Sequence, residues 1–592
     1  MRRALPWLAA AAGLLLAAAL AIAARRANGF DGFPLDDAWI HLTFARTLAE
    51  TGRFAYVPGD PLSSGSTSPL FTALLALGFL VTSSEKLLGL GVGLACHGGF
   101  LAALAWWARA RGATPGAAAA AVLLCAVDPR LAPLAVSGME TSLFLLAIAI
   151  VFAAYAAERE TLAAAALGVA CWVRPEALIL AAVLAIDRGL ARRRPGVAAV
   201  VALGAPVVAY VAFNLAVGGR WLPSTFAAKT AYYGGLARGT FARTDVWPLL
   251  GTGAWLIAAP FIVAGVVRAV RSPSVRAEAG WLLALPAAYA VLLPFGHRFD
   301  RYLVPVLPAA AVIAATTART LLERVPARRA VTAALLVVAA ALALPAARAG
   351  ARSYVELCRY HRVRHEAAGR WLAANTPPDA VVATHDIGAI AFYSRRRIVD
   401  VAGLVLDEAI AHLRDADPTP YLADLFDRRG VTHVACLRNW LEVDDVEPLF
   451  VADPAPEILE IYPWVPGRTH LVPKAASRLE QDGVARLVAG DADGAIAILD
   501  RAIEADPRSA RIRLLSGNAY AMARRLDLAE AAYRQAVALG PDLGEPRYRL
   551  ATVLATTGRR EEARALAAEL RREGKQRSIP RLAEFEAALG AP

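Results

Sequence analysis

Long apolar runs recur from the N-terminus to about residue 347, and they constrain the fold more than any other feature of the chain. The first, Leu5 to Ala24, is about 20 residues long, which is enough to cross the hydrocarbon core of a bilayer. No small-residue cleavage site separates it from Arg25 and Arg26, so we expect a retained span rather than a signal peptide. Further runs lie at about 69–83, 87–107, 116–134, 141–157, 161–186, 197–216, 248–269, 279–295, 302–320 and 330–347. The sequence therefore predicts a polytopic helical membrane protein with about eleven spans.

Arginine-rich loops predict the orientation of the spans. Cytoplasmic loops carry an excess of lysine and arginine, and strongly basic loops lie at 187–195, 268–276 and 323–329. Placing these loops inside puts the loop 28–68 and everything after Ala347 outside. We therefore expect an N-terminus in the cytoplasm and C-terminal domains outside it.

A fourth basic loop, at 109–111, does not fit strict alternation of the spans. The run 161–186 is interrupted by Arg174-Pro175-Glu176, and proline disfavours helical geometry in the residue before it. Every basic loop falls inside if this run forms two half-helices that meet at the outer face, and if one of the runs 69–83 and 87–107 is re-entrant. We prefer this arrangement.

The net charge of +12 gives little support to nucleic-acid binding. The basic residues cluster at span ends, where they serve as topology signals and contact anionic lipids, and no basic patch is interleaved with aromatic residues. The five cysteines lack the spacing of a zinc site. A disulfide between Cys358 and Cys436 stays open.

The composition changes past residue 350, where short β-rich runs alternate with helical segments. Strands are expected at 381–385, 398–402 and 431–437. This alternation predicts a small α/β domain over residues 351–474, after a membrane domain over residues 1–350.

A 34-residue repeat occupies residues 475–592. Small residues recur at this period at Gly483, Gly517, Ala551, Ala495, Ala529 and Ala563. The pattern is typical of tetratricopeptide repeats, in which paired helices stack into a solenoid that usually binds a protein partner. The third repeat, at 545–571, is the weakest.

The loop 28–68 carries the strongest candidates for catalysis, Asp36 and Asp37. They open a segment in which Ile40, Phe44 and Leu48 recur at helical spacing, and this narrow apolar stripe predicts a helix lying along the bilayer surface. Adjacent carboxylates raise each other's proton affinity, and partial burial does the same, so either aspartate could deprotonate a hydroxyl. The alternative is that one of them only caps the N-terminus of this helix.

Other ionisable residues that interrupt the apolar half are expected at the same outer face. Charged groups near spans suggest a function by default, and arginine or lysine beside an apolar wall can bind a lipid phosphate. Simpler readings also exist: Arg298 and Arg301 could snorkel at a span end, Glu140 could pair with Arg174, and Lys229 could be an ordinary loop lysine. The candidates for substrate binding are His41, Glu140, Arg174, Glu176, Lys229, His297, Arg298 and Arg301.

The order of several motifs resembles one family. They are L-D-D-A-W-I-H-L-T-F-A-R (35–46), V-P-G-D-P-L-S-S-G-S-T-S-P-L (57–70), S-G-M-E-T-S-L-F (137–144), V-R-P-E-A (173–177), L-P-S-T-F-A-A-K-T (222–230), R-Y-L-V-P-V-L-P (301–308), D-I-G-A-I-A-F-Y-S (386–394) and I-V-D-V-A-G-L (398–404). Together they resemble the polytopic GT-C glycosyltransferases, and most closely the branch that contains mycobacterial terminal arabinofuranosyltransferases. The resemblance covers about residues 1–440 and does not include the repeats.

This resemblance implies an inverting transfer of a sugar from a polyprenyl-phosphate donor to an envelope glycan, lipid or protein, at the outer face of the bacterial cytoplasmic membrane. By position, Asp36 or Asp37 would be the general base. Arg174, Lys229, Arg298 and Arg301 would stabilise the phosphate leaving group. No cofactor is expected, although some GT-C enzymes use a divalent metal ion, for which Asp36, Asp37 and His41 offer ligands.

The predicted fold is mainly α: a GT-C-type membrane domain, a small α/β domain and a tetratricopeptide solenoid. Two other functions stay open. A non-catalytic membrane anchor could display the repeats as a scaffold for envelope assembly. A lipid-linked sugar transporter would spread charged residues across the membrane midplane, whereas here they cluster at span ends.

Overall fold

The computed structural model describes residues 2–271, 273–323, 325–452, 457–575 and 579–590. Its contacts divide the chain into two compact units, which we describe separately. The membrane unit comprises Met1–Gly369, Asp386–Arg395 and Ala402–Leu413, and the soluble unit comprises Arg370–His385, Arg396–Val401 and Arg414–Pro592. Three segments of the region 351–474, residues 351–369, Asp386–Arg395 and Ala402–Leu413, thus belong to the membrane unit, and the domain boundaries drawn from the sequence stay predictions.

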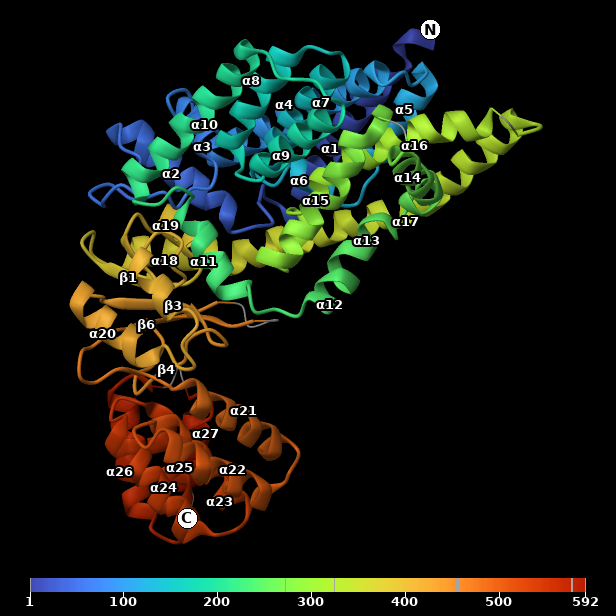
Figure 1. The fold of residues 1–592 in the computed structure, drawn as a ribbon. Helices are drawn as coiled ribbons and strands as arrows, with labels where there is room; N and C mark the ends of the chain where they lie inside the picture. Colours follow the sequence, from blue (N-terminus) through green and yellow to red (C-terminus); the bar gives the residue numbers. More distant parts are fainter. Residues whose placement is uncertain (1, 272, 324, 453–456, 576–578, 591–592) are drawn as a thin grey trace. The chain divides into compact units, whose positions relative to one another are not determined.

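Helices make up most of the membrane unit (Figure 1). By length and composition, six segments of the described chain can cross a bilayer, or seven if the bent pair Arg238–Leu250 and Trp255–Ala269 (α14) counts as one span. The six contain α1 (Leu5–Asn28), α4 (Glu85–Ala110), α10 (Val197–Gly218), α15 (Arg276–Leu292), α16 (Leu307–Leu322) and α17 (Arg328–His361). Shorter apolar helices are α3 (Pro69–Phe79), α5 (Pro115–Ala126), α7 (Thr141–Ala156) and α8 (Glu160–Val173). The chain is a multi-pass membrane protein, while the number of about eleven spans stays a prediction.

The apolar run 161–186 is broken at its proline, as predicted. α8 ends at Val173, Arg174 adopts an extended conformation with φ −153° and ψ 135°, and α9 (Ala177–Leu190) begins after Glu176. Pro175 explains the break, because it disfavours the helical conformation at Arg174. The side chain of Arg174 therefore leaves the helix axis and reaches residues of other elements.

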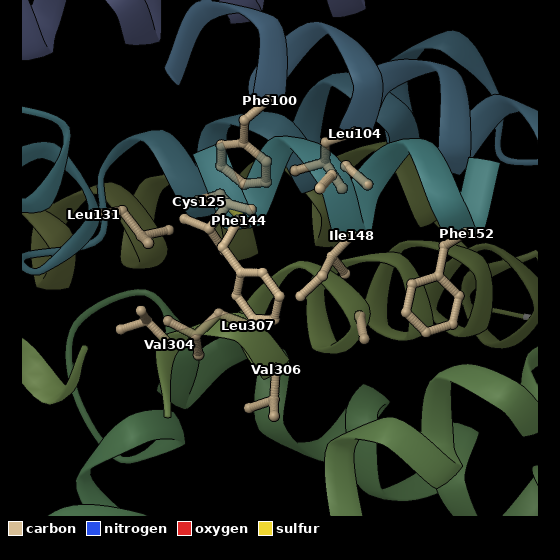
Figure 2. Close-up of a cluster of buried hydrophobic side chains, with 14 of the residues drawn as sticks. Phe100, Leu104, Cys125, Leu131, Phe144, Ile148, Phe152, Val304, Val306 and Leu307 are labelled. Atoms are coloured by element: carbon tan, nitrogen blue, oxygen red, sulfur yellow. The ribbon is translucent and has the colours of Figure 1, made fainter. Parts of the chain in front are cut away.

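The core of the membrane unit lies where α4, α5, α7 and α16 meet. Figure 2 shows Phe100 of α4, Phe144 and Phe152 of α7 and Leu307 of α16 in this core, and all four are buried. The rings of Trp107 and Phe152 stack with their centroids 4.5 Å apart. Since α16 is buried over most of its length, it is a central helix, and the segment that precedes it is held inside the unit.

The helix after the two aspartates, α2 (Asp37–Thr51), is largely buried within the membrane unit. Nine of its fifteen residues are buried, including Trp39 and Leu42, which lie outside the predicted apolar stripe. The narrow apolar stripe predicted for this helix is too small, because α3 and α19 (Ile387–Ser394) pack against α2 and cover further faces. Its position along the bilayer surface stays a prediction.

Five strands form the main sheet of the soluble unit, in the order β2–β1–β3–β6–β5. The three predicted strands are present as parallel neighbours: β1 (Val381–Thr384), β2 (Arg397–Asp400) and β3 (His433–Leu437). Two antiparallel strands extend the sheet, β6 (Leu459–Pro463) and β5 (Phe450–Val451). The sheet and the neighbouring α20 (Thr419–Arg429) confirm an α/β region. All five cysteines are free, so no disulfide joins Cys358 to Cys436.

Paired helices of the predicted repeats follow the sheet in the soluble unit (orange to red in Figure 1). They are α21 (Lys474–Val488), α22 (Ala492–Ala505), α23 (Ala510–Met522), α24 (Leu526–Leu539), α25 (Gly544–Thr556) and α26 (Arg560–Arg572), and α27 (Leu582–Gly590) packs after them. The small residues lie where paired helices touch: Ala529 and Ala551 are buried, and a side chain at Gly517 would collide with the ring of Tyr533. The repeat prediction is confirmed.

A small ribbon of the soluble unit, formed by β4 (Val443–Asp444) and β7 (His470–Leu471), binds the start of the second repeat. The imidazole of His470 lies between two carboxylates, with Nδ1 2.6 Å from Asp445 and Nε2 3.1 Å from Asp506. The hydroxyl of Ser509, the N-cap of α23, donates to Asp444. Carboxylates at a helix N-terminus are stabilising, so the ribbon and α23 hold each other in place.

Candidate active site

A cavity of about 210 Å³ lies inside the membrane unit, lined by parts of α2, α9, α11 (Ser224–Tyr233) and α15. One wall is apolar and includes Ile179, Phe226 and Leu292. The lining also contains charged residues, which include seven of the ten residues proposed from the sequence. These are Asp37, His41, Glu140, Arg174, Glu176, Lys229 and Arg301.

The carboxylate of Asp37 forms ion pairs with two cations at the cavity. Arg301, which is 264 residues away in the chain, donates to Oδ2 of Asp37, and Nζ of Lys229 lies 3.3 Å from the same oxygen. Burial by itself would raise the pKa of Asp37, but Arg301 and Lys229 outweigh it and hold that pKa well below its usual range. Asp37 is therefore ionised, and its side chain remains 24% exposed.

Tyr302 holds the two cations in place. Its hydroxyl accepts hydrogen bonds from Lys229 at 3.0 Å and from Arg301 at 3.3 Å, and its ring stacks on Tyr289 with the centroids 5.3 Å apart. Arg301 is almost completely buried, and it follows a stretch with positive φ at His297, Phe299 and Asp300. Lys229 is thus no ordinary loop lysine, and Arg301 does not snorkel.

His41, Glu140 and Arg174 form a second charged group in the lining of the cavity. Nε2 of His41 lies 3.3 Å from Glu140, whose other oxygen lies 3.7 Å from Arg174, so the Glu140–Arg174 pair considered from the sequence is present. Nδ1 of His41 shares a hydrogen bond of 3.0 Å with Ser66. Burial would raise the pKa of Glu140, but its hydrogen bond with His41 and the nearby Arg174 lower it to about 2.

Arg174 connects His41 and Glu140 to the rest of the site. Its Nε donates to Glu176 at 3.1 Å, one Nη donates to the hydroxyl of Tyr289 at 3.3 Å, and the other donates to the carbonyl of Arg301 at 3.2 Å. The proline break makes this reach possible, because Arg174 is not in helical geometry. The guanidinium is therefore fixed by the neighbouring Glu176 and by two residues that are distant in sequence, Tyr289 and Arg301.

Three of the proposed residues do not line the cavity. His297 lies behind it, with Nε2 3.2 Å from Arg301. Arg298 is exposed, and its guanidinium stacks over the ring of Tyr360 with a distance of 5.4 Å to the centroid. The third is Asp36.

Asp36 binds the first turn of α19 instead. Its two carboxylate oxygens accept the backbone N–H groups of Gly388 at 2.7 Å and Ala389 at 2.8 Å. The carboxylate makes no capping bond to α2, so the capping alternative holds for a different helix from the one expected. Burial raises the pKa of Asp36 to about 6, with His365 opposing the shift and Asp386 adding to it.

The expectation that Asp36 and Asp37 raise each other's proton affinity is therefore wrong. Their side chains bind different elements, and the like charge near Asp36 is that of Asp386, in the D-I-G-A motif. Asp37 has a lowered pKa because its neighbours are cations.

Comparisons with known proteins agree with this architecture. A family model described as a domain of unknown function (DUF8728) matches residues 353–484, and a tetratricopeptide-repeat model matches residues 483–543. A comparison of the sequence with curated proteins finds no match. Among solved structures, ArnT from Cupriavidus metallidurans bound to undecaprenyl phosphate superposes with a TM-score of 0.50 at 16% identity, over 76% of this chain and 97% of that one.

Two further structures resemble the chain less closely. The apo state of the same ArnT has a TM-score of 0.43 at 16% identity, over 72% of this chain and 93% of that one. The apo oligosaccharyltransferase of Archaeoglobus fulgidus has a TM-score of 0.42 at 14% identity, over 72% and 69% of the two chains. The fold assignment follows from the superposition on undecaprenyl-phosphate-bound ArnT. The chain has a GT-C glycosyltransferase fold.

Within this GT-C fold, two tyrosines that line the cavity, Tyr289 and Tyr302, are not among the ten residues proposed for the site. Tyr302 follows Arg301 directly in the R-Y-L-V-P motif, so that motif carried a signal. Tyr289 lies inside an apolar helix, and nothing in its local sequence distinguishes it from a core tyrosine. The resemblance to the mycobacterial branch stays a prediction.

The residues offered as ligands for a metal ion do not converge in this GT-C fold. Asp36 binds backbone N–H groups of α19, Asp37 binds two cations, and His41 binds Glu140 and Ser66. Among the described residues, no group of three His, Cys, Asp or Glu side chains is arranged to hold a metal ion. We therefore derive no step through a metal.

Proposed function

We propose that the chain is an inverting glycosyltransferase that moves a sugar from a polyprenyl-phosphate donor to a glycan, lipid or protein acceptor. The reaction takes place at the outer face of a bacterial cytoplasmic membrane. The observation that carries the proposal is the ionised Asp37 at a half-apolar cavity, next to Arg301 and Lys229, in a GT-C fold. The apolar wall suits a lipid-linked donor, and the cations suit its phosphate.

In this reaction the acceptor hydroxyl oxygen attacks the anomeric carbon of the donor sugar. The bond from that carbon to the phosphate oxygen breaks, and polyprenyl phosphate leaves with the electron pair. Asp37 accepts the proton of the hydroxyl as the general base. Attack on the face opposite to the leaving group inverts the anomeric centre.

The ion pairs of Asp37 suggest how a carboxylate with a lowered pKa can serve as a base. In the free enzyme, Arg301 and Lys229 keep Asp37 ionised. A donor phosphate that binds these cations competes with Asp37 for them and so raises the proton affinity of the carboxylate. The same cations then stabilise the charge that develops on the leaving phosphate. Arg174, which also lines the cavity and donates to the carbonyl of Arg301, is a further candidate for that task.

The proposal is tested by the release of polyprenyl phosphate. Purified chain in lipid nanodiscs would be supplied with polyprenyl-phosphate sugars and a membrane extract, both from cells that lack the protein, so that the unused donor and the unmodified acceptor are both present. We expect release of polyprenyl phosphate by the wild type and almost none by Asp37→Asn. A wild-type protein that binds these lipids but leaves the sugar–phosphate bond intact would contradict the proposal and favour a transporter or a scaffold.

The tetratricopeptide repeats are proposed to bind a protein partner or the acceptor. Their charged contacts with the ribbon fix them to the α/β part of the soluble unit. Removing residues after Pro473 would test their contribution: transfer to a small acceptor analogue should persist while transfer in cells falls. Full activity in both assays would leave the repeats without a role in the reaction.

A further inference from the structure

A second cavity, which is polar, lies near the start of α15, whose other end borders the candidate active site. Its volume is about 260 Å³, and its lining includes three arginines, Arg111, Arg268 and Arg319. The other polar residues that line it are Ser274, Thr316, Thr317, Thr320 and Glu323. Three of the loops that carry basic residues in the sequence thus meet at one hollow.

The two cavities lie near opposite ends of α15. α15 begins next to Val275, which lines the basic cavity, and Tyr289 near its other end lines the candidate active site. Fourteen residues of helix correspond to about 21 Å. The basic cavity therefore lies toward the membrane face opposite to the candidate active site.

The three guanidinium groups keep much of their hydrogen-bonding capacity. Arg268 donates to the hydroxyl of Thr320 at 3.2 Å, and among the described residues it has no carboxylate partner. Arg319 pairs with the half-exposed Glu323 at 3.0 Å and donates to the carbonyl of Gly112 at 2.8 Å. Arg111 donates from Nε to the buried carboxylate of Glu278 at 2.6 Å, so its charge is already paired. A guanidinium has five N–H donors, so each arginine retains donors for a further acceptor.

The hydroxyl groups position the arginine rather than the ligand. Thr320 accepts the bond from Arg268 and donates to the carbonyl of Thr316 at 3.2 Å, while Thr316 donates to the carbonyl of Val312 at 2.8 Å. A ligand here would therefore have to be an acceptor that pairs with guanidinium groups. A phosphate group meets that requirement, because it can bind arginine through two parallel hydrogen bonds.

Apolar side chains beside Arg268 indicate what carries the phosphate. Val263, Val267 and Val270 on the same stretch are 62%, 65% and 84% exposed. Side chains this exposed on a membrane helix suit contact with lipid chains, and basic pockets between membrane helices bind anionic head groups. We propose that the cavity of Arg111, Arg268 and Arg319 binds the phosphate of an anionic phospholipid, in the leaflet opposite to the candidate active site.

Lipid binding by the full-length protein in detergent tests this site. The probes are phosphatidylglycerol, phosphatidylcholine, which has the same phosphodiester but no net charge, and inorganic phosphate, and native mass spectrometry measures their affinities. For the double variant Arg268→Gln/Arg319→Gln we expect the affinity for phosphatidylglycerol to fall about 10-fold or more, consistent with the loss of hydrogen bonds to a charged group. The control Arg192→Gln/Arg193→Gln removes the same charge from exposed loop residues and should bind as the wild type does.

The outcomes separate the sources of the phosphate. The protein could bind inorganic phosphate only when the arginines are present, and show no preference for phosphatidylglycerol over phosphatidylcholine. That result would support a phosphate site and assign it to a soluble ligand. Equal affinity of the wild type and the double variant for every probe, or an equal loss in the control, overturns the proposal. If the double variant does not fold, the single variant Arg268→Lys can replace it. Lysine keeps the charge but cannot donate two parallel hydrogen bonds to one phosphate, so this variant should bind phosphatidylglycerol more weakly than the wild type. The test does not depend on transfer activity, so its failure leaves the proposed function untouched.

Discussion

The carboxylate of Asp36 caps the first turn of α19, whereas the carboxylate of the next residue, Asp37, forms ion pairs with Arg301 and Lys229. Two adjacent and chemically identical side chains are thus assigned to different tasks. Asp36 fixes α19 against α2, and Asp37 presents a charge at the cavity. The two aspartates should therefore differ in their effects on transfer and on stability.

Replacing Asp37 should abolish transfer, whereas replacing Asp36 should not. Asp37→Asn removes the base but keeps the shape of the side chain, and a general base contributes about 10²–10⁴-fold to the rate. Asp36→Asn, which lies outside the cavity, should lower the rate less than about 10-fold. The initial rate of polyprenyl phosphate release measures both. Equal losses in the two variants would show that the division between the neighbours is not functional.

The stability contribution of Asp36 should fall as the pH rises from about 4 to 6. Because burial raises its pKa to about 6 in the folded protein, the folded state holds a proton that the unfolded state has already released in this window. Each unit of pKa difference corresponds to about 1.4 kcal/mol. Thermal unfolding of wild type and Asp36→Asn at several pH values measures the difference. A difference that grows with pH would mean that the N–H bonds of α19 outweigh burial.

A methyl group at Gly388 should separate α19 from α2. The Cβ of Gly388→Ala would collide with the carbonyl oxygen of Asp36, which is backbone and cannot rotate away. Overpacking of this kind costs about 1–3 kcal/mol, so the unfolding temperature should drop. Gly189→Ala is the matched control, because its Cβ would meet open space within α9 and should be neutral or slightly stabilising. A normal melting temperature for Gly388→Ala would contradict the close contact.

Alkaline pH should loosen the contact between the ribbon and the second repeat. Burial alone would lower the pKa of His470, but the carboxylates of Asp445 and Asp506 raise it to about 9. The imidazolium therefore stabilises the folded state fully below about pH 6.5, and this contribution is lost as the pH rises to 9. The difference in unfolding temperature between the wild type and His470→Gln should shrink over that range. A pH-independent difference would indicate that His470 acts through packing alone.

A reporter that is active only outside the cytoplasm should work when fused after Pro592. The prediction rests on the basic loops at 187–195 and 268–276, which are expected inside, and on the cavity of Arg111, Arg268 and Arg319 at that face. A reporter that requires the cytoplasm serves as the control and should be silent at the same position. Activity of the cytoplasmic reporter would invert the topology and remove Asp37 from an outer-face substrate.

The sequence alone determined the broad architecture, because local patterns carry it. Apolar length identifies membrane helices, a 34-residue period identifies the repeats, and Pro175 marks the break between α8 and α9. These features depend on residues close together in the chain, so they can be interpreted without the tertiary structure. Seven of the ten proposed site residues also line one cavity, since charged residues are rare in membrane segments and tend to gather where a function requires them.

Only the tertiary structure decided what each charge does. Asp36 and Asp37 cannot be distinguished by local sequence, and their pKa values move in opposite directions because burial dominates at one and distant cations dominate at the other. Arg298 and Arg301 are three residues apart, yet one is exposed and the other is buried against Asp37. The physical reason is that burial and Coulomb interactions act across space, over separations such as the 264 residues between Asp37 and Arg301, which no local pattern records.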